Sequence, residues 1–153
     1  MSRSWPIPAL SLVLVVAAAG GCSGGGDYVL DDDIAMRVGL GDCLGSASVD
    51  QPETLTIVGC DEAHVAEIYY TFNVPEGDGS WPGESDIEDD AWVVCERAFE
   101  PFVGTPYDDS SFLLSYFGPS RDSWETMSDR EVLCVLGYFD GDLTKGTARN
   151  SFG

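Results

Sequence analysis

The sequence has few basic side chains, and this shortage excludes several partners. Only 7 of its 153 residues are Lys or Arg, against 27 Asp or Glu, so the formal net charge is −20. Such a surface repels phosphate backbones and anionic lipid headgroups, which argues against nucleic-acid binding and against docking on a membrane through a basic patch. All the acidic residues follow residue 26, so the charge belongs to the part of the chain after that point.

The sequence also lacks the common catalytic and metal-binding motifs. It has no Cys-x-x-Cys pair for a zinc knuckle or a thioredoxin-like site, and no Gly-x-Ser-x-Gly elbow for a serine hydrolase. Because His64 is the only histidine, a zinc hydrolase would have to take its other ligands from carboxylates. We therefore expect no metal, no cofactor, no catalytic residue and no enzymatic activity.

His64 and Glu67 are the candidate functional residues if the chain has chemistry of its own. His64 could act as a general base oriented by Glu67 or Asp61, which makes a small cell-wall hydrolase the alternative function. In the simpler interpretation, the His64 ring bonds the backbone at a turn before a strand. A further alternative is a ligand or calcium sensor on the acidic face, although the adjacent acids at 31–33 lack the ligand spacing of an EF-hand loop.

No hydrophobic run is long enough to be a stable membrane span. The longest run, at 7–19, would reach about 20 Å across a bilayer core about 30 Å thick. With Arg3 before it and small residues after it, the run has the form of a secretory signal. The quartet Ala-Gly-Gly-Cys at 19–22 resembles the bacterial lipobox, with Ala19 where Leu is most usual. This resemblance implies that Cys22 takes a diacylglyceryl group and that the chain is cut just before it.

The lipobox resemblance divides the chain into three expected parts. Residues 1–21 are expected to be a lipoprotein signal peptide, 22–37 a flexible acidic linker and 38–150 an extracytoplasmic domain. Lipid on Cys22, palmitate included, would anchor the protein to the outer side of the cell membrane. The cysteine count agrees with lipid on Cys22. The other four of the five cysteines are an even number, so all of them can pair as disulfides in an oxidising compartment.

Strand signals alternate with one helix signal in the expected domain. Runs of β-branched and aromatic residues predict strands at 53–60, 67–74, 111–118 and 130–139, and more weakly at 142–149. Both faces of the 130–139 run are apolar, which predicts a central strand. The pattern is typical of an α+β fold, in which a small, mainly antiparallel sheet carries one packed helix.

The helix is predicted from an apolar stripe that extends from Ile87 to Phe102. Ser85 and Glu88 stand at capping-box spacing, which places the start of the helix at Ser85. Pro101 should bend the helix or end it early, and Gly104 is the expected terminator.

The remaining four cysteines, Cys43, Cys60, Cys95 and Cys134, are expected to form two disulfides. Among three connectivities we prefer Cys43–Cys60, which flanks an early strand, and Cys95–Cys134, which joins the helix to the central strand. In the chain-entropy model these two loops would stabilise the fold by about 3 and about 4 kcal/mol.

Four elements occur in a fixed order: Gly-Asp-Cys at 41–43, Cys-x3-His-x2-Glu at 60–67, Cys95, and Trp-x4-Asp-Arg-x3-Cys at 124–134. In this order they resemble the septum-formation domain family of actinobacterial membrane proteins and lipoproteins, over nearly all of 38–149. Ala63 stands where the family often has Pro, and Ser128 stands where it usually has Gly. The resemblance implies a binding or scaffolding role in the cell envelope, in septum formation, with an envelope or division protein as partner. It transfers no catalytic residue.

Overall fold

The structure is a computed structural model that describes residues 38–46, 55–138 and 143–153, and its central element is one antiparallel sheet. The strands are β1 (Cys43–Ser46), β2 (Leu55–Val58), β3 (Ala66–Asn73), β4 (Phe112–Phe117) and β5 (Glu131–Tyr138). They lie in the order β2-β1-β3-β5-β4, and every neighbouring pair is antiparallel. The expected signal peptide, the linker and Cys22 lie outside the described residues.

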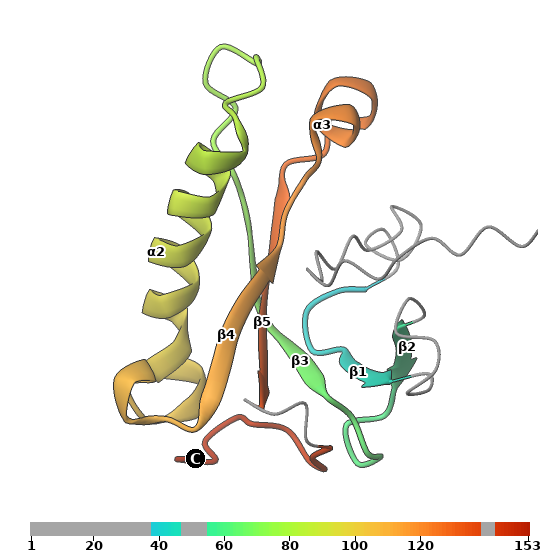
Figure 1. Cartoon of the computed structure of the whole chain (residues 1–153), viewed down its shortest axis with the longest axis vertical. Helices are drawn as coiled ribbons and strands as arrows, with labels where there is room; N and C mark the ends of the chain where they lie inside the picture. Colours follow the sequence, from blue (N-terminus) through green and yellow to red (C-terminus); the bar gives the residue numbers. More distant parts are fainter. Residues whose placement is uncertain (1–37, 47–54, 139–142) are drawn as a thin grey trace, which may run out of the picture.

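Helix α2 (Glu84–Val103) covers one face of the sheet, and a short helix α3 (Arg121–Met127) links β4 to β5 (Figure 1). A single 3-10 turn, η1 (Tyr107–Asp109), lies between α2 and β4. The predicted α+β class, with an antiparallel sheet, a packed helix and two disulfides, is confirmed. Helix α3 is an addition that the sequence pattern did not predict, because it has too few residues for an apolar periodicity to emerge.

Four of the predicted strands correspond to β2, β3, β4 and β5. The central position of β5 is confirmed, because it lies between β3 and β4 and its residues from Val132 to Leu136 are buried. The weak strand predicted at 142–149 is wrong in its described part: 143–149 makes only an isolated bridge between Thr144 and His64. Strand β1 was not predicted, because its sequence, CLGS, contains no β-branched or aromatic residue, whereas the equally short β2 reads LTIV.

Helix α2 begins differently from the prediction but ends at the predicted residue. The N-cap is Gly83, with φ 109°, and no side chain caps the helix, so the predicted capping box of Ser85 and Glu88 is wrong. Pro101 lies inside the helix, which continues to Val103 because Phe102 and Val103 are buried against the sheet. Gly104 ends the helix in the left-handed conformation, as predicted.

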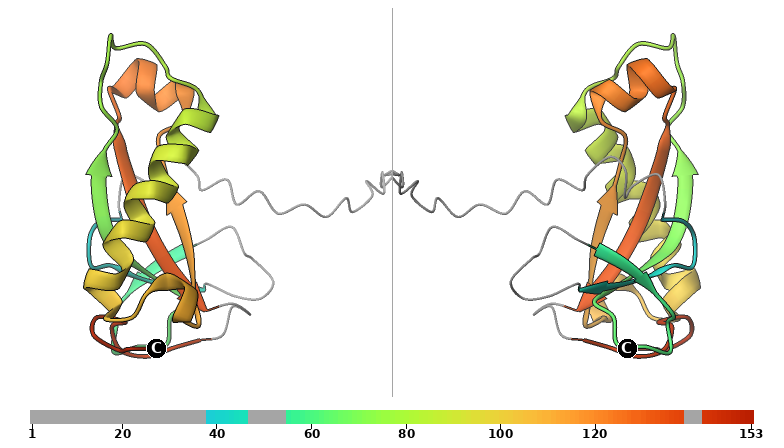
Figure 2. Two further views of the ribbon diagram at one scale, coloured as in Figure 1. Left: turned by 90° about the vertical axis from the view of Figure 1, so that its left-hand side faces the viewer. Right: turned by 90° about the vertical axis from the view of Figure 1, so that its right-hand side faces the viewer.

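The largest apolar cluster lies between α2 and the sheet. It combines aromatic side chains with the second disulfide: Tyr69, Cys95, Phe99, Phe102, Val103, Phe112, Leu114, Cys134, Leu136 and Ala148. Figure 2 shows α2 laid over the long strands, while β1 and β2 stand apart at the other end of the sheet. Side chains of α2 and of the long strands β3, β4 and β5 therefore bury one another in this cluster.

A second cluster surrounds Trp124 of α3. Its indole N–H donates to the Gly79 carbonyl at 3.0 Å, and the Arg130 guanidinium lies 3.6 Å from the ring centroid. Ser120 caps the helix by accepting from the Ser123 N–H, and Ser128 ends it with a left-handed φ of 56°. The Trp-x4-Asp-Arg motif is therefore a structural unit that fixes α3 to the start of β5.

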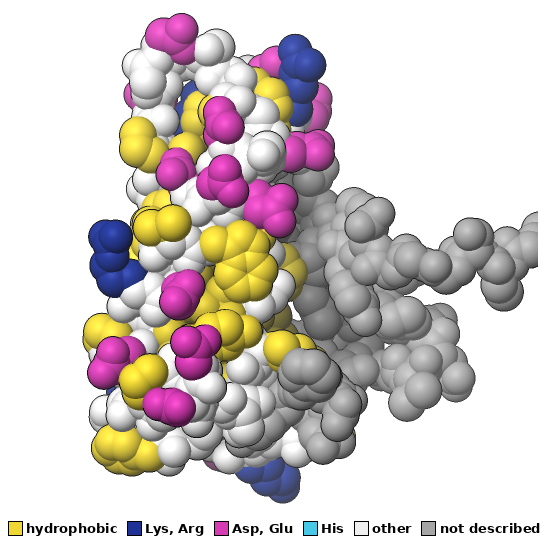
Figure 3. All heavy atoms as spheres, turned by 60° about the vertical axis from the view of Figure 1, so that its left-hand side comes forward, with side chains coloured by type: hydrophobic (Ala, Val, Ile, Leu, Met, Phe, Trp, Pro, Cys, Tyr) yellow, Lys and Arg dark blue, Asp and Glu magenta, His cyan; other side chains and the backbone are white. Residues whose placement is uncertain are grey.

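The outer face of α2 is acidic, with hydrophobic side chains among the carboxylates (Figure 3). Trp92 of α2 is 38% exposed and packs edge-on against Tyr116 of β4. Neither of the described helices combines the length and the apolar composition that crossing a bilayer requires.

Candidate functional site

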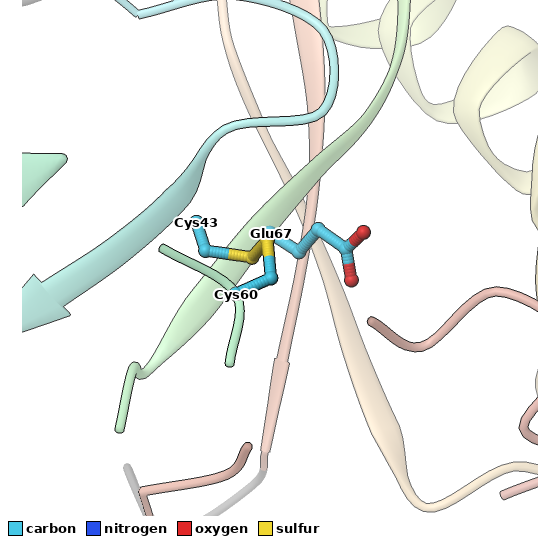
Figure 4. A group of neighbouring side chains, drawn as sticks. All are labelled: Cys43, Cys60 and Glu67. Carbon is cyan, nitrogen blue, oxygen red and sulfur yellow. A yellow bond between two sulfur atoms is a disulfide. The ribbon is translucent and has the colours of Figure 1, made fainter. Parts of the chain in front are cut away.

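The two predicted site residues lie where β3 begins, and both are buried. His64 is 1% exposed and Glu67 is 3% exposed. The disulfide between Cys43 of β1 and Cys60 lies beside them, with its sulfur atoms and a Glu67 carboxylate oxygen within 4.8 Å of one another (Figure 4). The C-terminal segment, residues 143–149, closes the other side of the site, which the spacing of the motif alone could not reveal.

Both carboxylate oxygens of Glu67 are occupied by the protein itself. Oε1 accepts a hydrogen bond from the Thr147 hydroxyl at 2.6 Å, and Oε2 accepts one from the Ala148 N–H at 2.8 Å. The carboxylate points away from the disulfide (Figure 4). Because bonds to an ionised acceptor are stronger than neutral ones, this carboxylate attaches the C-terminal segment to β3.

His64 is also used to hold the same segment. Its N–H donates to the Thr144 carbonyl at 3.0 Å, and its own carbonyl accepts from the Thr144 N–H at 2.8 Å. The ring Nδ1 lies 2.9 Å from the Glu62 carbonyl oxygen, which can only accept, so Nδ1 carries the proton. The ring thus bonds the backbone at a turn before a strand, as the simpler interpretation expects.

No hydrogen bond joins His64 to Glu67 or to Asp61 within the described part of the chain. The base-and-orienter pair that a hydrolase would need is therefore not assembled in this structure. The two side chains do line one cavity together with Phe112, Leu136 and the 144–148 segment, but its volume is only about 90 Å³. That volume suits a few water molecules, whereas small-molecule sites measure about 300 Å³ or more.

The same cluster does not suit a metal ion. Cys43, Cys60 and Glu67 form the one ligand-like group found among the described residues. The two sulfurs are bonded to each other, and a disulfide cannot supply the thiolates that bind metals.

Both disulfides join the pairs that the sequence favoured. Cys43 is bonded to Cys60 with Cα atoms 5.2 Å apart, and Cys95 to Cys134 with Cα atoms 5.4 Å apart. These separations lie within the usual range for the bond. Cys95–Cys134 is buried and joins α2 to β5, whereas Cys43–Cys60 joins β1 to the segment that leads into β3.

A larger hollow lies elsewhere, and the sequence contained no signal for it. It is a groove of about 490 Å³ between α2 and β3 that also includes Leu40 and Arg149. Its residues come from four separate segments of the chain and share no spacing, so only the folded structure brings them together.

Comparison with known proteins gives a family match over most of the chain. The family model described as "Septum formation" matches residues 31–150, which include the four disulfide cysteines, His64 and Glu67. Two mycobacterial proteins, each named "Putative lipoprotein LppN", are similar to this chain. The one from Mycobacterium bovis is 27% identical over 124 residues, and the one from Mycobacterium tuberculosis is 29% identical over 125.

In both comparisons the aligned region is 74% of this chain and 63% of the relative, so the chain spans less than two thirds of the curated relatives' length. No solved structure matches the chain.

Proposed function

The chain belongs to the septum formation family, and on that premise we propose that it is a membrane-anchored lipoprotein of the cell envelope with a binding or scaffolding role. One observation carries the non-enzymatic part of this proposal. The carboxylate of Glu67 and the main chain of His64 bond the C-terminal segment, and the buried His64 ring bonds the Glu62 carbonyl through Nδ1. A wall-degrading enzyme would need at least one of them free to contact a polymer.

The anchor in this proposal is lipid on Cys22, facing the extracytoplasmic side. Its support is the lipobox-like quartet at 19–22 and the lipoprotein names of the two mycobacterial relatives. Two acyl chains would hold the protein stably, whereas one chain binds only marginally. The division into a signal peptide (1–21), a linker (22–37) and an outer domain (38–150) belongs to the same proposal.

The partner in this proposal is an envelope or division protein, in keeping with the septum formation family. The net charge of −20 opposes a nucleic acid as partner. It also opposes a direct electrostatic contact between the domain and an anionic bilayer, so lipid on Cys22 is the proposed attachment.

The anchor is tested with the full chain and its Cys22→Ala variant in an actinobacterial host. Membrane fractionation should place the parent protein in the membrane, and mass spectrometry should show an acylated Cys22 at its amino terminus. The variant should leave the membrane fraction. An unacylated amino terminus on membrane-bound parent protein would contradict the proposal.

The non-enzymatic role is tested with two substitutions of His64. His64→Asn keeps a side-chain N–H that can donate to the Glu62 carbonyl but cannot act as a base, whereas His64→Ala keeps neither property. We expect His64→Asn to retain both the melting temperature and any cell-wall phenotype, and His64→Ala to lower both. A phenotype lost in His64→Asn at unchanged melting temperature would favour the hydrolase. A melting temperature raised by millimolar calcium would favour the sensor.

A further inference from the structure

The groove between α2 and β3 combines an apolar floor with exposed apolar walls. Tyr69 and Phe102 form the buried floor, and the walls include Leu40, 63% exposed, and Tyr70, 42% exposed. The volume of about 490 Å³ falls within the range of sites that hold a ligand side chain or a small molecule. Figure 2 shows that β3 is the outermost of the long strands, and Tyr69 and Tyr70 of this strand line the groove.

Two arginines on this groove have no acidic partner. Arg97 of α2 and Arg149 of the C-terminal segment form no ion pair with any described residue, whereas Arg121 and Arg130 pair with glutamates. The Arg149 guanidinium lies 4.4 Å from the centroid of the Phe102 ring, which holds it over the floor of the groove. In a chain with a net charge of −20, two arginines that lie beside apolar side chains and form no ion pair with the described residues favour an anionic group attached to an apolar one.

The strand beside the groove has an open edge. β1 pairs with β3 only at Ala66 and Glu67, and the turn before β1 bonds Ile68. Val74 donates its N–H to the Arg130 carbonyl at the β5 side. Because residues of an antiparallel strand alternate in direction, Thr71 and Asn73 direct their N–H and C=O groups away from β5. No strand pairs with these groups within the described part of the chain.

We propose that this groove binds an extended acidic peptide segment of a partner protein, which adds as a strand to the open edge of β3. Main-chain hydrogen bonds to Thr71 and Asn73 supply the register, since strand addition uses the free groups of an edge. One apolar side chain enters the groove. A carboxylate two residues away lies on the same face of the added strand and meets Arg97 and Arg149.

This inference rests on the binding role proposed above and names the chemistry of the partner. A peptide fits better than a lipid surface because the acidic domain is repelled by anionic headgroups, and because the groove is too open to shield an acyl chain from water. A flexible segment with a few carboxylates can enter the groove without bringing a charged plane against the acidic surface.

The probe is a blocked heptapeptide with the order Thr-Asp-Thr-Phe-Thr-Asp-Thr. It reads the same in both directions, so it can add parallel or antiparallel to β3 with Phe and an Asp on one face. The matched control replaces both Asp with Lys. With the full chain in mild detergent, we expect saturable binding of the acidic peptide with a dissociation constant below about 1 mM. We expect the amides of Thr71 and Asn73 to be protected from hydrogen exchange on binding.

Two charge reversals locate the binding site. Arg97→Glu should weaken binding of the acidic peptide by about tenfold or more, because a charge-assisted hydrogen bond is replaced by repulsion between carboxylates. Arg121→Glu changes the net charge equally on an exposed helix away from the groove, and it should alter binding by less than about twofold. Both positions are exposed, so both variants should fold as the parent does.

Other results would overturn the inference. It fails if the acidic and basic peptides bind equally, if Arg121→Glu weakens binding as much as Arg97→Glu, or if Thr71 and Asn73 exchange unchanged. Sedimentation showing a dimer that Arg97→Glu disrupts would assign the groove to a second copy. Arg97-dependent binding to phosphatidylglycerol vesicles by the Cys22→Ala chain would assign it to lipid. If the peptide does not bind, while Cys22 is acylated and His64→Asn changes neither the melting temperature nor the phenotype, the groove is excluded as a peptide site. The proposed anchored binding role would not be affected by that result.

Discussion

The α2 side of the sheet and its β1–β2 end are stabilised in different ways. Between α2 and the strands β3, β4 and β5, aromatic and aliphatic side chains form a continuous apolar cluster that encloses Cys95–Cys134. At the other end, Ile57 of β2 is 48% exposed and β1 contributes only Leu44 to an apolar cluster. There the chain is connected by Cys43–Cys60 and by the hydrogen bonds of His64 and Glu67.

This difference accounts for the contacts that the candidate site residues, His64 and Glu67, make in the fold. An end of the sheet with little apolar area to bury needs other connections, and buried ionisable groups are stable only when they are bonded. The Glu67 carboxylate bonds the C-terminal segment, and the His64 ring bonds the Glu62 carbonyl while the His64 main chain bonds Thr144. A motif of His, Glu and Cys can therefore indicate hydrogen bonds and a disulfide that stabilise a part of a domain with little apolar area to bury.

The largest effect is expected on the α2 side, from the double variant Cys95→Ala with Cys134→Ala. It removes a loop constraint worth about 4 kcal/mol and also leaves a gap among tightly packed side chains. Denaturant unfolding of the oxidised parent and of the variant measures the loss. A loss smaller than that of the other disulfide would show that the apolar cluster does not depend on this bond.

The corresponding variant at the other end, Cys43→Ala with Cys60→Ala, should lose about 3 kcal/mol. Here we also expect local opening, because few apolar contacts remain to hold β1 against β3. Hydrogen exchange should accelerate at Val65, whose N–H donates to the Leu44 carbonyl, before the strands β4 and β5 open. Uniform acceleration over the whole domain would contradict the proposed difference between the ends.

Glu67→Ala should destabilise the domain by about 2 kcal/mol, because the buried Ala148 N–H loses a charged acceptor. Exchange at Ala148 should rise most, since that amide donates directly to Glu67. Glu67→Gln is the matched control: its amide oxygen can still accept from Ala148, so it should retain most of the stability. Equal losses in the two variants would mean that the shape of the side chain, and not its bonds, holds the segment.

Tyr69→Phe should cost about 1 kcal/mol near neutral pH, because the Tyr69 hydroxyl donates to the Cys95 carbonyl at 2.6 Å. Burial raises the pKa of Tyr69 above its ordinary value, and the nearby Tyr107 adds to the rise. The folded state therefore holds this proton more tightly, and its contribution to stability is lost as the pH rises above about 10. The free energy of unfolding, measured from pH 8 to 11, should fall less steeply with pH in the variant. Identical slopes would exclude Tyr69 as the cause of the pH dependence.

The smallest expected effect is a gain from Ser128→Gly at the end of α3. Ser128 has a φ of 56°, a conformation that glycine adopts without strain, so the substitution should stabilise the domain by about 1 kcal/mol or less. Ser128→Ala keeps the Cβ atom and should give no gain. A loss of stability in the glycine variant would indicate that the added conformational entropy of the unfolded chain outweighs the strain relieved at the turn.

Local signals predicted the parts of the fold whose residues lie close together in the chain. The alternation in 130–139 identified a central strand, and the stripe from Ile87 to Phe102 identified α2. The same reasoning missed β1, which has no β-branched or aromatic residue, and misplaced the cap of α2, because Gly83 turns the chain before Ser85 can cap it. It expected Pro101 to bend α2 or to end it early, and the helix continues to Val103 because burial of Phe102 and Val103 outweighs the missing hydrogen bond.

The sequence by itself determined the acidic surface, the α+β pattern and the even set of four cysteines, because composition and short-range periodicity are properties of neighbouring residues. Only the tertiary structure decided the partners of the Glu67 carboxylate and of the His64 main chain, since these lie about 80 residues further along the chain. It also decided that Arg97 and Arg149 line one groove. Contacts between distant segments depend on packing the whole domain, and no local spacing specifies them.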